Sequence, residues 1–287
     1  VSGYLYTNCG SNNLPLEKKL LKRIIAYGIP YTIFTALYYI FKIVFSSYVN
    51  SKVNSVDLLA AFIKPFGYLW FIYALMLIEI IQDIVQEICG KRKAGEKLKY
   101  YLTAVAILLS IVQYYCSKHL NSHFTDYVVS DIMRMWIYFL LGVYFGKMIL
   151  KAIKDLNTKT IITVTAVFFV LNFACFNKMI YKSWITTFLM ALCGIIICIY
   201  ISTRFTECGL IEYIGKMSFP IYLLHDYILT VCRIVVNAFH INEWSIAFAI
   251  SFCSALTLPI IACILSKKIF HLDFVFYPSR YLITKKE

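Results

Sequence analysis

The chain has few charged residues for its length, and this scarcity excludes an ordinary soluble domain. Asp, Glu, Lys and Arg make up 15% of the 287 residues, and hydrophobic residues make up 61%. The mean hydropathy is +0.73. A soluble protein of this size needs a far larger share of polar side chains to cover its surface. The composition therefore predicts a protein embedded in a membrane.

Patterns typical of several other protein classes are also missing. No Gly/Ser-rich linker and no repeat of fixed period divides the sequence, so we expect one domain over residues 1–287. The 10 cysteines include no Cys-x-x-Cys pair, and most lie in apolar surroundings, so we expect neither a disulfide framework nor a metal site. The amino terminus lacks the basic start and the cleavage site of a signal peptide.

Long apolar runs fill most of the chain. A helix of about 20 residues crosses a hydrocarbon core of about 30 Å, and about eight runs reach this length. The runs are too long for the strands of a membrane barrel, so the predicted fold class is all-α, a polytopic transmembrane helical bundle. The runs lie near 24–46, 66–88, 98–115, 127–150, 159–175, 184–203, 219–239 and 243–266.

Lysines and arginines are concentrated in every second gap between these runs. Alternate gaps and termini hold 20 of the 28 basic residues, and the opposite gaps hold 5. Basic residues are retained on the cytoplasmic side of a membrane, so the pattern predicts a multi-pass protein of the cell membrane with a cytoplasmic carboxyl terminus. The net charge of +13 is then explained by a basic rim that faces anionic lipid, and we expect no nucleic-acid partner.

The first residues, Val1–Tyr6, have the character of the last part of an apolar helix that runs toward the cytoplasm. The basic residues that follow them place the end of this stub inside. We therefore expect a helix stub before the eight complete spans. The inferred whole protein has ten spans, and its first span and part of its second are missing from this sequence.

Ionisable groups within the runs fall into two sets. At 1.5 Å per residue, Arg134 and Arg233 lie roughly 10 Å and 9 Å from the outer ends of their helices, and His225 and Glu79 lie roughly 9 Å and 13 Å from the inner ends. Such groups are costly in lipid and usually face a cavity or a partner. Two ordinary explanations stay open: an ion pair within one helix, and a histidine bonded to a carbonyl. The outer set is Asp131, Arg134 and Arg233, and the inner set is His225, Glu79 and Asp83.

A basic cluster opens the helix that runs through Tyr31. The amino end of a helix carries partial positive charge and free N–H groups, so cations at this place favour phosphate binding. Anchoring at the cytoplasmic surface explains the same residues equally well. The cluster consists of Lys18, Lys19, Lys22 and Arg23.

The stretch Ile214–His225 joins a Gly-Lys-x-Ser turn to a helix that begins Tyr-Leu-x-His. This stretch resembles the signature of the acyltransferase-3 family of integral membrane O-acyltransferases. Further segments resemble the family's motifs in the same order along the chain. They are Ser2–Leu5, Lys18–Ile24 with Pro30 and Tyr31, Leu69–Phe71, and Arg134 with Leu141–Gly146.

The resemblance implies transfer of an acyl group, commonly acetyl, from cytoplasmic acyl-CoA to a hydroxyl group of a carbohydrate or a lipid-linked glycan. The partners would be membrane lipid, acetyl-CoA as donor, and that acceptor. Lys18, Lys19, Lys22 and Arg23 would meet the phosphates of CoA, and Arg134, Arg233, Asp131 and Glu79 would bind the acceptor. His225 matches the later signature histidine and is the catalytic candidate. The family's main histidine lies in a first span that precedes this sequence, so the chain as it stands is expected to be a fragment or inactive.

A different class of membrane protein also carries buried charges. A multi-pass transporter, or a flippase for lipid-linked substrates, would need no acyl-transfer chemistry. Such transporters usually show repeated halves and broken helices, and no repeat is evident in this sequence.

Overall fold

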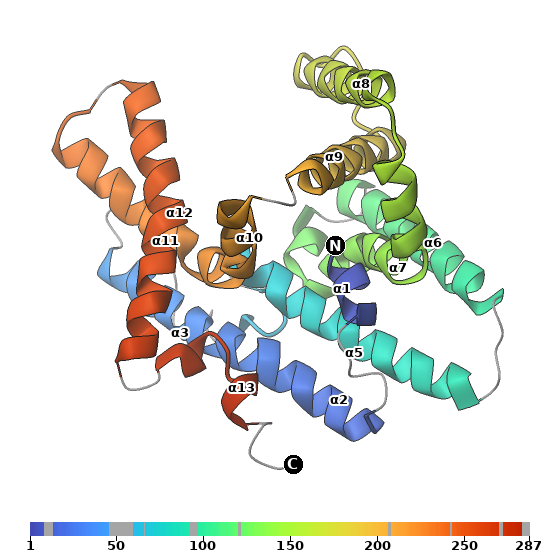
Figure 1. Ribbon diagram of the computed structural model, residues 1–287, viewed down its shortest axis with the longest axis horizontal. Helices are drawn as coiled ribbons and strands as arrows, with labels where there is room; N and C mark the ends of the chain where they lie inside the picture. The colour runs from blue at the N-terminus through green and yellow to red at the C-terminus, as the bar shows by residue number, and fades with distance from the viewer. Residues whose placement is uncertain are drawn as a thin grey trace. The chain divides into compact units, whose positions relative to one another are not determined.

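The structure, a computed structural model, describes residues 1–8, 14–45, 60–65, 67–91, 97–119, 122–205, 208–241, 243–269 and 272–282. Every regular element within these ranges is a helix (Figure 1), which confirms the all-α prediction. In chain order the main helices are α1 (Ser2–Asn8), α2 (Leu16–Arg23), α3 (Ile29–Val44), α5 (Trp70–Lys91), α6 (Lys97–His119), α7 (Val128–Lys154), α8 (Thr158–Phe176), α9 (Trp184–Arg204), α10 (Gly209–Lys216), α11 (Ser218–Ala238), α12 (Trp244–Lys268) and α13 (Ser279–Leu282).

Eight helical segments of the described chain are long and apolar enough to cross a membrane, as predicted. The first of them, Leu16–Val44, joins α2 and α3 through one wider turn, η2 (Ile24–Gly28). The others are Gly67–Cys89, Lys97–His119, Val128–Lys154, Thr158–Phe176, Trp184–Arg204, Ser218–Ala238 and Trp244–Lys268. The limits of these seven agree with the predicted runs to within a few residues, whereas the first span begins at Leu16 and not near residue 24 as predicted. The helix α1 forms the expected short helix before them.

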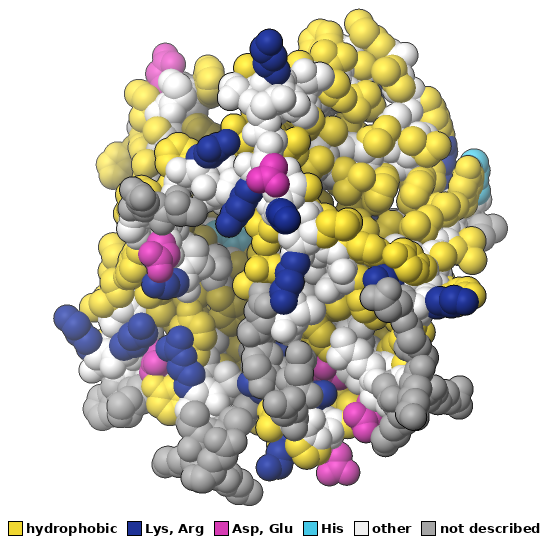
Figure 2. Space-filling view, turned by 45° about the vertical axis from the view of Figure 1, so that its right-hand side comes forward, with side chains coloured by type: hydrophobic (Ala, Val, Ile, Leu, Met, Phe, Trp, Pro, Cys, Tyr) yellow, Lys and Arg dark blue, Asp and Glu magenta, His cyan; other side chains and the backbone are white. Residues whose placement is uncertain are grey.

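Large apolar side chains cover much of the outside of these helices. Phe169 on α8 is 65% exposed and Trp244 on α12 is 80% exposed. Figure 2 shows broad areas of hydrophobic side chains on the face that it draws. A surface of this kind is stable against lipid, where apolar side chains meet apolar solvent and the backbone is satisfied within each helix. The protein is thus a multi-pass membrane protein.

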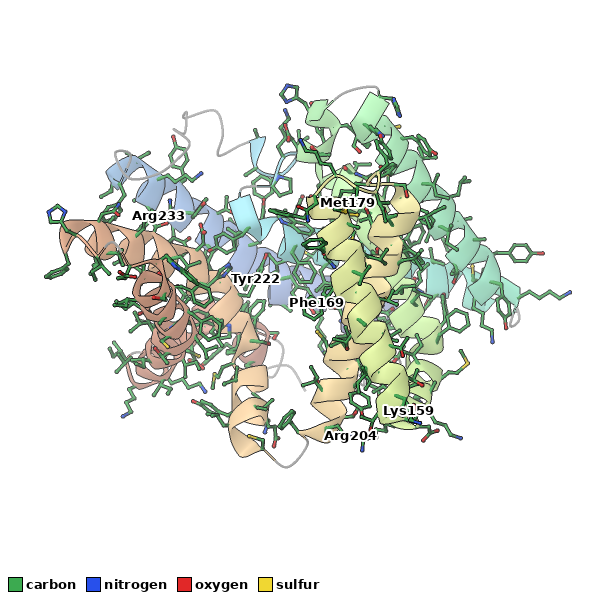
Figure 3. All side chains as sticks on the ribbon, turned by 90° about the horizontal axis from the view of Figure 1, so that it is seen from above. Lys159, Phe169, Met179, Arg204, Tyr222 and Arg233 are labelled. Carbon is green, nitrogen blue, oxygen red and sulfur yellow. The ribbon has the colours of Figure 1, made fainter. Side chains whose placement is uncertain are left out.

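Local sequence signals set the ends of two neighbouring spans. The Asn157 side chain accepts a hydrogen bond of 2.8 Å from the N–H of Thr160 and begins α8. Ser183 and Thr186 exchange side-chain and backbone hydrogen bonds in a capping box that begins α9. Figure 3 shows α8 and α9 side by side, with Lys159 and Phe169 labelled on α8 and Arg204 on α9.

The chain divides into two compact units, each described by itself. The first unit comprises Val1–Asn12, Gly95–Ser122 and Met133–Tyr213. The second comprises Asn13–Ala94, His123–Ile132 and Ile214–Glu287.

In the first unit, α1 packs against α7 at a contact that admits only glycine. A Cβ atom on Gly3 would lie 2.0 Å from the carbonyl oxygen of Phe139, and one on Gly142 would lie 2.9 Å from the backbone nitrogen of Tyr4. Gly142 and Gly146 are four residues apart and share a face of α7, the spacing at which small residues let membrane helices approach closely. The glycine-rich stretch of α7 thus serves to hold α1.

In the second unit, the helix Leu16–Val44 lies antiparallel to α5. The rings of Tyr31 and Tyr73 stack with centroids 4.5 Å apart, and the rings of Tyr38 and Tyr68 meet edge to face at 5.5 Å. Residue numbers that rise along one helix fall along the other. This register places α2 beside the carboxyl half of α5, where Arg23 meets Glu79 and Asp83. In the same unit, α11 and α12 lie side by side (Figure 1).

Pro30 accounts for the wider turn between α2 and α3. Proline has no N–H group, so residue 30 cannot donate to the carbonyl four residues before it. The N–H of Ile29 instead bonds to the carbonyl of Ile24, five residues back, which makes the turn Ile24–Gly28 a π-helix. Turns of this type inside α-helices are frequent at functional sites.

Candidate active site

Arg23, at the end of α2, lies in a buried cluster with two carboxylates of α5. Its Nη1 atom is 2.8 Å from Oε2 of Glu79, and its Nε atom donates to Oδ2 of Asp83 at 3.1 Å. The three side chains expose 8%, 4% and 2% of their areas. Tyr27 adds a hydrogen bond of 3.3 Å to Oε1 of Glu79. Glu79 and Asp83 are one turn apart and share the face of α5 that receives Arg23.

The three lysines of the predicted phosphate cluster differ from Arg23 in their surroundings. Lys18 is exposed, and Lys19 and Lys22 are half-buried. The sequence predicted one role for all four cations. In the structure Arg23 is buried and paired with two carboxylates, whereas the lysines lie nearer the surface. Lys18, Lys19 and Lys22 remain the candidates for contact with an anionic ligand.

His225 lies on the first half of α11 against aromatic side chains. Its Nδ1 atom is 2.7 Å from the carbonyl oxygen of Tyr222, one turn earlier. A carbonyl oxygen only accepts hydrogen bonds, so Nδ1 carries the proton in the neutral ring and Nε2 is left as the proton acceptor. The ring of Tyr68 meets the imidazole edge to face with centroids 4.8 Å apart, and the ring of Tyr222 lies 6.0 Å away.

Two reciprocal hydrogen bonds join the segment before α5 to α11. The hydroxyl group of Tyr68, in the short helix η3 (Gly67–Leu69), donates to the carbonyl oxygen of Leu223 at 2.6 Å. The hydroxyl group of Tyr222 donates to the carbonyl oxygen of Tyr68 at 2.5 Å. Leu69 and Leu223, both fully buried, pack in the hydrophobic core beneath these bonds. The His225 region is therefore built on two elements that hold each other.

A second hydroxyl and a carboxylate lie close to these rings. Tyr38 of α3 hydrogen-bonds to Asp226, the residue after His225. Gly67, at φ +51°, passes so close to Tyr38 that an added Cβ atom would lie 3.1 Å from its hydroxyl oxygen. Tyr227 donates a hydrogen bond of 2.7 Å to the carbonyl oxygen of Phe34 and thereby ties α11 to α3.

The predicted inner set therefore occupies two places in the second unit. His225 contacts Tyr68, just before α5 begins. Glu79 lies eleven residues after Tyr68 in the chain and pairs with Arg23. Eleven residues correspond to roughly 16 Å along a helix. In the sequence, His225 and Glu79 lie at similar distances from the ends of their helices, which is why they were grouped. Such distances do not show how one helix is shifted along its axis relative to another, so they could not show that the two side chains lie apart.

The predicted outer set is also divided. Asp131 is buried, whereas Arg134, one turn further along α7, is exposed. Arg233 is exposed toward the carboxyl end of α11, where Figure 3 labels it beyond Tyr222. Arg134 belongs to the first unit and Arg233 to the second. A shared outer cavity for the two arginines stays a prediction.

The carboxyl-terminal segment packs against α3 and the start of α11 within the second unit. Phe276 is 7% exposed and packs in the core cluster with Tyr31 and Phe34 of α3. The hydroxyl group of Tyr281 donates to Asp273, and this hydrogen bond raises the pKa of Tyr281. Tyr277 meets the ring of Phe219 at 6.1 Å, next to the start of α11. The segment supports the amino end of α11, the helix that carries His225.

The sequence did not single out Tyr68 or Tyr222 as site residues. Tyr68 stands directly before the Leu-Trp-Phe motif, and Tyr222 stands one turn before His225. The available signals were that Tyr222 is the tyrosine of the Tyr-Leu-x-His signature and that Tyr68 adjoins the Leu-Trp-Phe motif. In the described part of the chain, no group of three or more His, Cys, Asp or Glu side chains is arranged to hold a metal ion.

These observations define an integral membrane protein of eight candidate spans that carries a histidine and a separate buried ion cluster in one unit. The model of one protein family, described as an acyltransferase domain, matches residues 1–264. The chain therefore belongs to the acyltransferase-3 family, as its motifs indicated, and is a membrane acyltransferase. No curated protein and no solved structure matches the chain.

Proposed function

We propose that this protein is an O-acyltransferase that moves an acetyl group from cytoplasmic acetyl-CoA to a hydroxyl group of a cell-surface carbohydrate or a lipid-linked glycan. The family match over residues 1–264 carries the proposal, because it covers nearly all the membrane-spanning helices. The orientation proposed with it has the amino end of α2 and the carboxyl terminus in the cytoplasm. The excess of basic residues at these ends supports that orientation.

In this proposal His225 is the general base. Acyl transfer to an alcohol requires removal of the hydroxyl proton, and a neutral imidazole can accept it near neutral pH. The hydrogen bond from Nδ1 to the carbonyl of Tyr222 supports the role, since it holds the proton on Nδ1 and leaves Nε2 free to act. His225 is half-buried, so the ring is partly shielded from water and still accessible.

The test of the base compares two histidine variants in membranes supplied with labelled acetyl-CoA. His225→Asn keeps an N–H group near the position of Nδ1 and removes Nε2. General base catalysis contributes about 10²–10⁴-fold, so label transfer into the carbohydrate fraction should fall by at least about 100-fold. His240→Asn is the matched control, because His240 is exposed with φ 51°, a conformation that asparagine tolerates. Full transfer by His225→Asn would remove the base from the proposal.

Lys18, Lys19 and Lys22 are proposed to bind the phosphates of CoA. They lie on α2, which Arg23 fixes to α5 through Glu79 and Asp83. A positioned helix with cations near its surface suits an anionic donor that arrives from the cytoplasm.

The donor test measures the affinity of the purified protein for CoA. Replacing the three lysines of α2 by alanine should weaken CoA binding at least about tenfold, which corresponds to about 1.4 kcal/mol. The difference should shrink at high salt, because exposed charges are screened. Lys147, Lys151 and Lys154, exposed on α7, provide a matched triple alanine control. Equal loss in both variants would reduce the cluster on α2 to a general surface charge.

A further inference from the structure

We infer that Tyr68 is a positioning residue for His225. This inference rests on the proposed role of His225 as the general base. Nothing in the sequence assigned a function to Tyr68. The geometry connects it to His225 in three independent ways, through its ring, its hydroxyl group and its backbone.

The ring of Tyr68 fixes the orientation of the imidazole from the side. The two rings meet edge to face at a centroid distance of 4.8 Å and an interplanar angle of 71°. Edge-to-face contact is a preferred arrangement of aromatic rings and resists rotation of either one. Nδ1 is held at its other side by the carbonyl of Tyr222, so the imidazole is restrained at two points. Nε2 is thereby aimed in a fixed direction.

The hydroxyl group and the backbone of Tyr68 hold the helix that carries His225. The bond from Tyr68 to the carbonyl of Leu223 and the bond from Tyr222 to the carbonyl of Tyr68 link the same two short segments in opposite directions. A pair of reciprocal bonds fixes both the distance and the register of these segments. Tyr68 therefore sets the location of His225 as well as the angle of its ring.

The surroundings keep Tyr68 itself in one place. Its ring contacts the rings of Tyr38 at 5.5 Å, Tyr222 at 5.8 Å and Tyr227 at 6.4 Å, each nearly perpendicular. A misplacement of the reacting atom by about 1 Å can lower the rate about 10²-fold, so base catalysis depends on how firmly the base is held. A ring enclosed by three others meets that requirement better than a flexible side chain.

The experiment measures how fast diethylpyrocarbonate, a reagent that acylates imidazole nitrogen, modifies each histidine. Peptide mass spectrometry gives the rate at His225 relative to exposed His240 in the same molecule. Tyr68→Leu removes the ring, so the freed imidazole should be modified several-fold faster relative to His240. Tyr68→Phe keeps the ring contact and should leave the ratio near that of the unaltered protein. Tyr73→Leu is the matched control, because Tyr73 lies in the same candidate span, Gly67–Cys89, and stacks on Tyr31.

Acyl transfer provides the second readout. Tyr68→Leu should lower kcat at least about tenfold with an unchanged KM for acetyl-CoA, because the chemistry and not donor binding depends on the position of His225. Tyr68→Phe should restore most of kcat. Tyr68→Met, whose unbranched and flexible side chain adapts better to the space left by the ring, replaces Tyr68→Leu if the latter does not fold, with the same expected results.

Two outcomes separate the inference from the proposed function. An unchanged modification ratio in folded Tyr68→Leu would overturn the positioning role, whatever the acyl-transfer activity. A raised ratio together with an active His225→Asn variant would confirm that Tyr68 holds His225 and would refute the proposed base, because the modification rate does not depend on acyl transfer.

Discussion

Replacing Arg23 should destabilise the protein strongly, because its guanidinium lies between two buried carboxylates. Arg23→Met keeps much of the side-chain volume and removes the charge. Glu79 and Asp83, exposed by only 4% and 2%, then lose their cation. Breaking a buried pair by removing one partner typically costs about 3–5 kcal/mol, and most of that cost is the carboxylate left without compensation.

A charge-balanced variant distinguishes destabilisation by the uncompensated carboxylates from destabilisation by lost packing. Arg23→Met combined with Glu79→Gln and Asp83→Asn removes all three charges while keeping the shapes. Replacing a whole buried ion cluster is often nearly neutral, so the triple variant should regain most of the lost stability. Lys19→Met, on the same helix but only half-buried, should cost less than about 1 kcal/mol.

The assay is the free energy of unfolding in mild detergent, titrated with a denaturing detergent and followed by tryptophan fluorescence. The four proteins are compared at one pH and one protein concentration. An Arg23→Met protein within about 1 kcal/mol of the unaltered chain would refute the reasoning, and so would a triple variant as unstable as the single one. The same comparison shows why Arg23 is unsuited to test donor binding, since its loss would disturb the fold that holds the lysines.

Three further outcomes follow from the structure. Gly142→Leu should release α1 from α7, because even a Cβ atom at this position would lie 2.9 Å from the backbone nitrogen of Tyr4. The release is measured as faster proteolysis within Val1–Asn8, and unchanged protection would contradict the packing. The hydrogen bond to Asp273 raises the pKa of Tyr281 above its ordinary value of 10.0, so its stabilisation is present below pH 10 and is lost as pH rises through the raised pKa. Protection of the carboxyl-terminal segment from protease should fall over that alkaline range, and Tyr281→Phe should abolish the dependence. Cys89 should resist a membrane-impermeant thiol reagent in intact cells; its labelling would reverse the proposed orientation.

The sequence was sufficient to predict the spans and the family. Apolar runs of membrane length can be read one residue after another, because lipid requires each helix to satisfy its own backbone. Seven of the eight predicted runs accordingly match helices such as Val128–Lys154 and Trp184–Arg204 within a few residues, whereas the first span begins earlier than predicted, at Leu16. The signature around His225 depends on local spacing, and the family that it indicated is confirmed by the family match over residues 1–264.

Tertiary structure alone decided which polar groups meet. The sequence assigned Arg23 to phosphate binding with the three lysines and grouped His225 with Glu79 by depth. The structure pairs Arg23 with Glu79 and places His225 against Tyr68. Pairing across helices depends on their offset and rotation, and many long-range contacts at once determine these. A hydropathy pattern along a single helix carries the depth of a residue but not the identity of its neighbour on another helix.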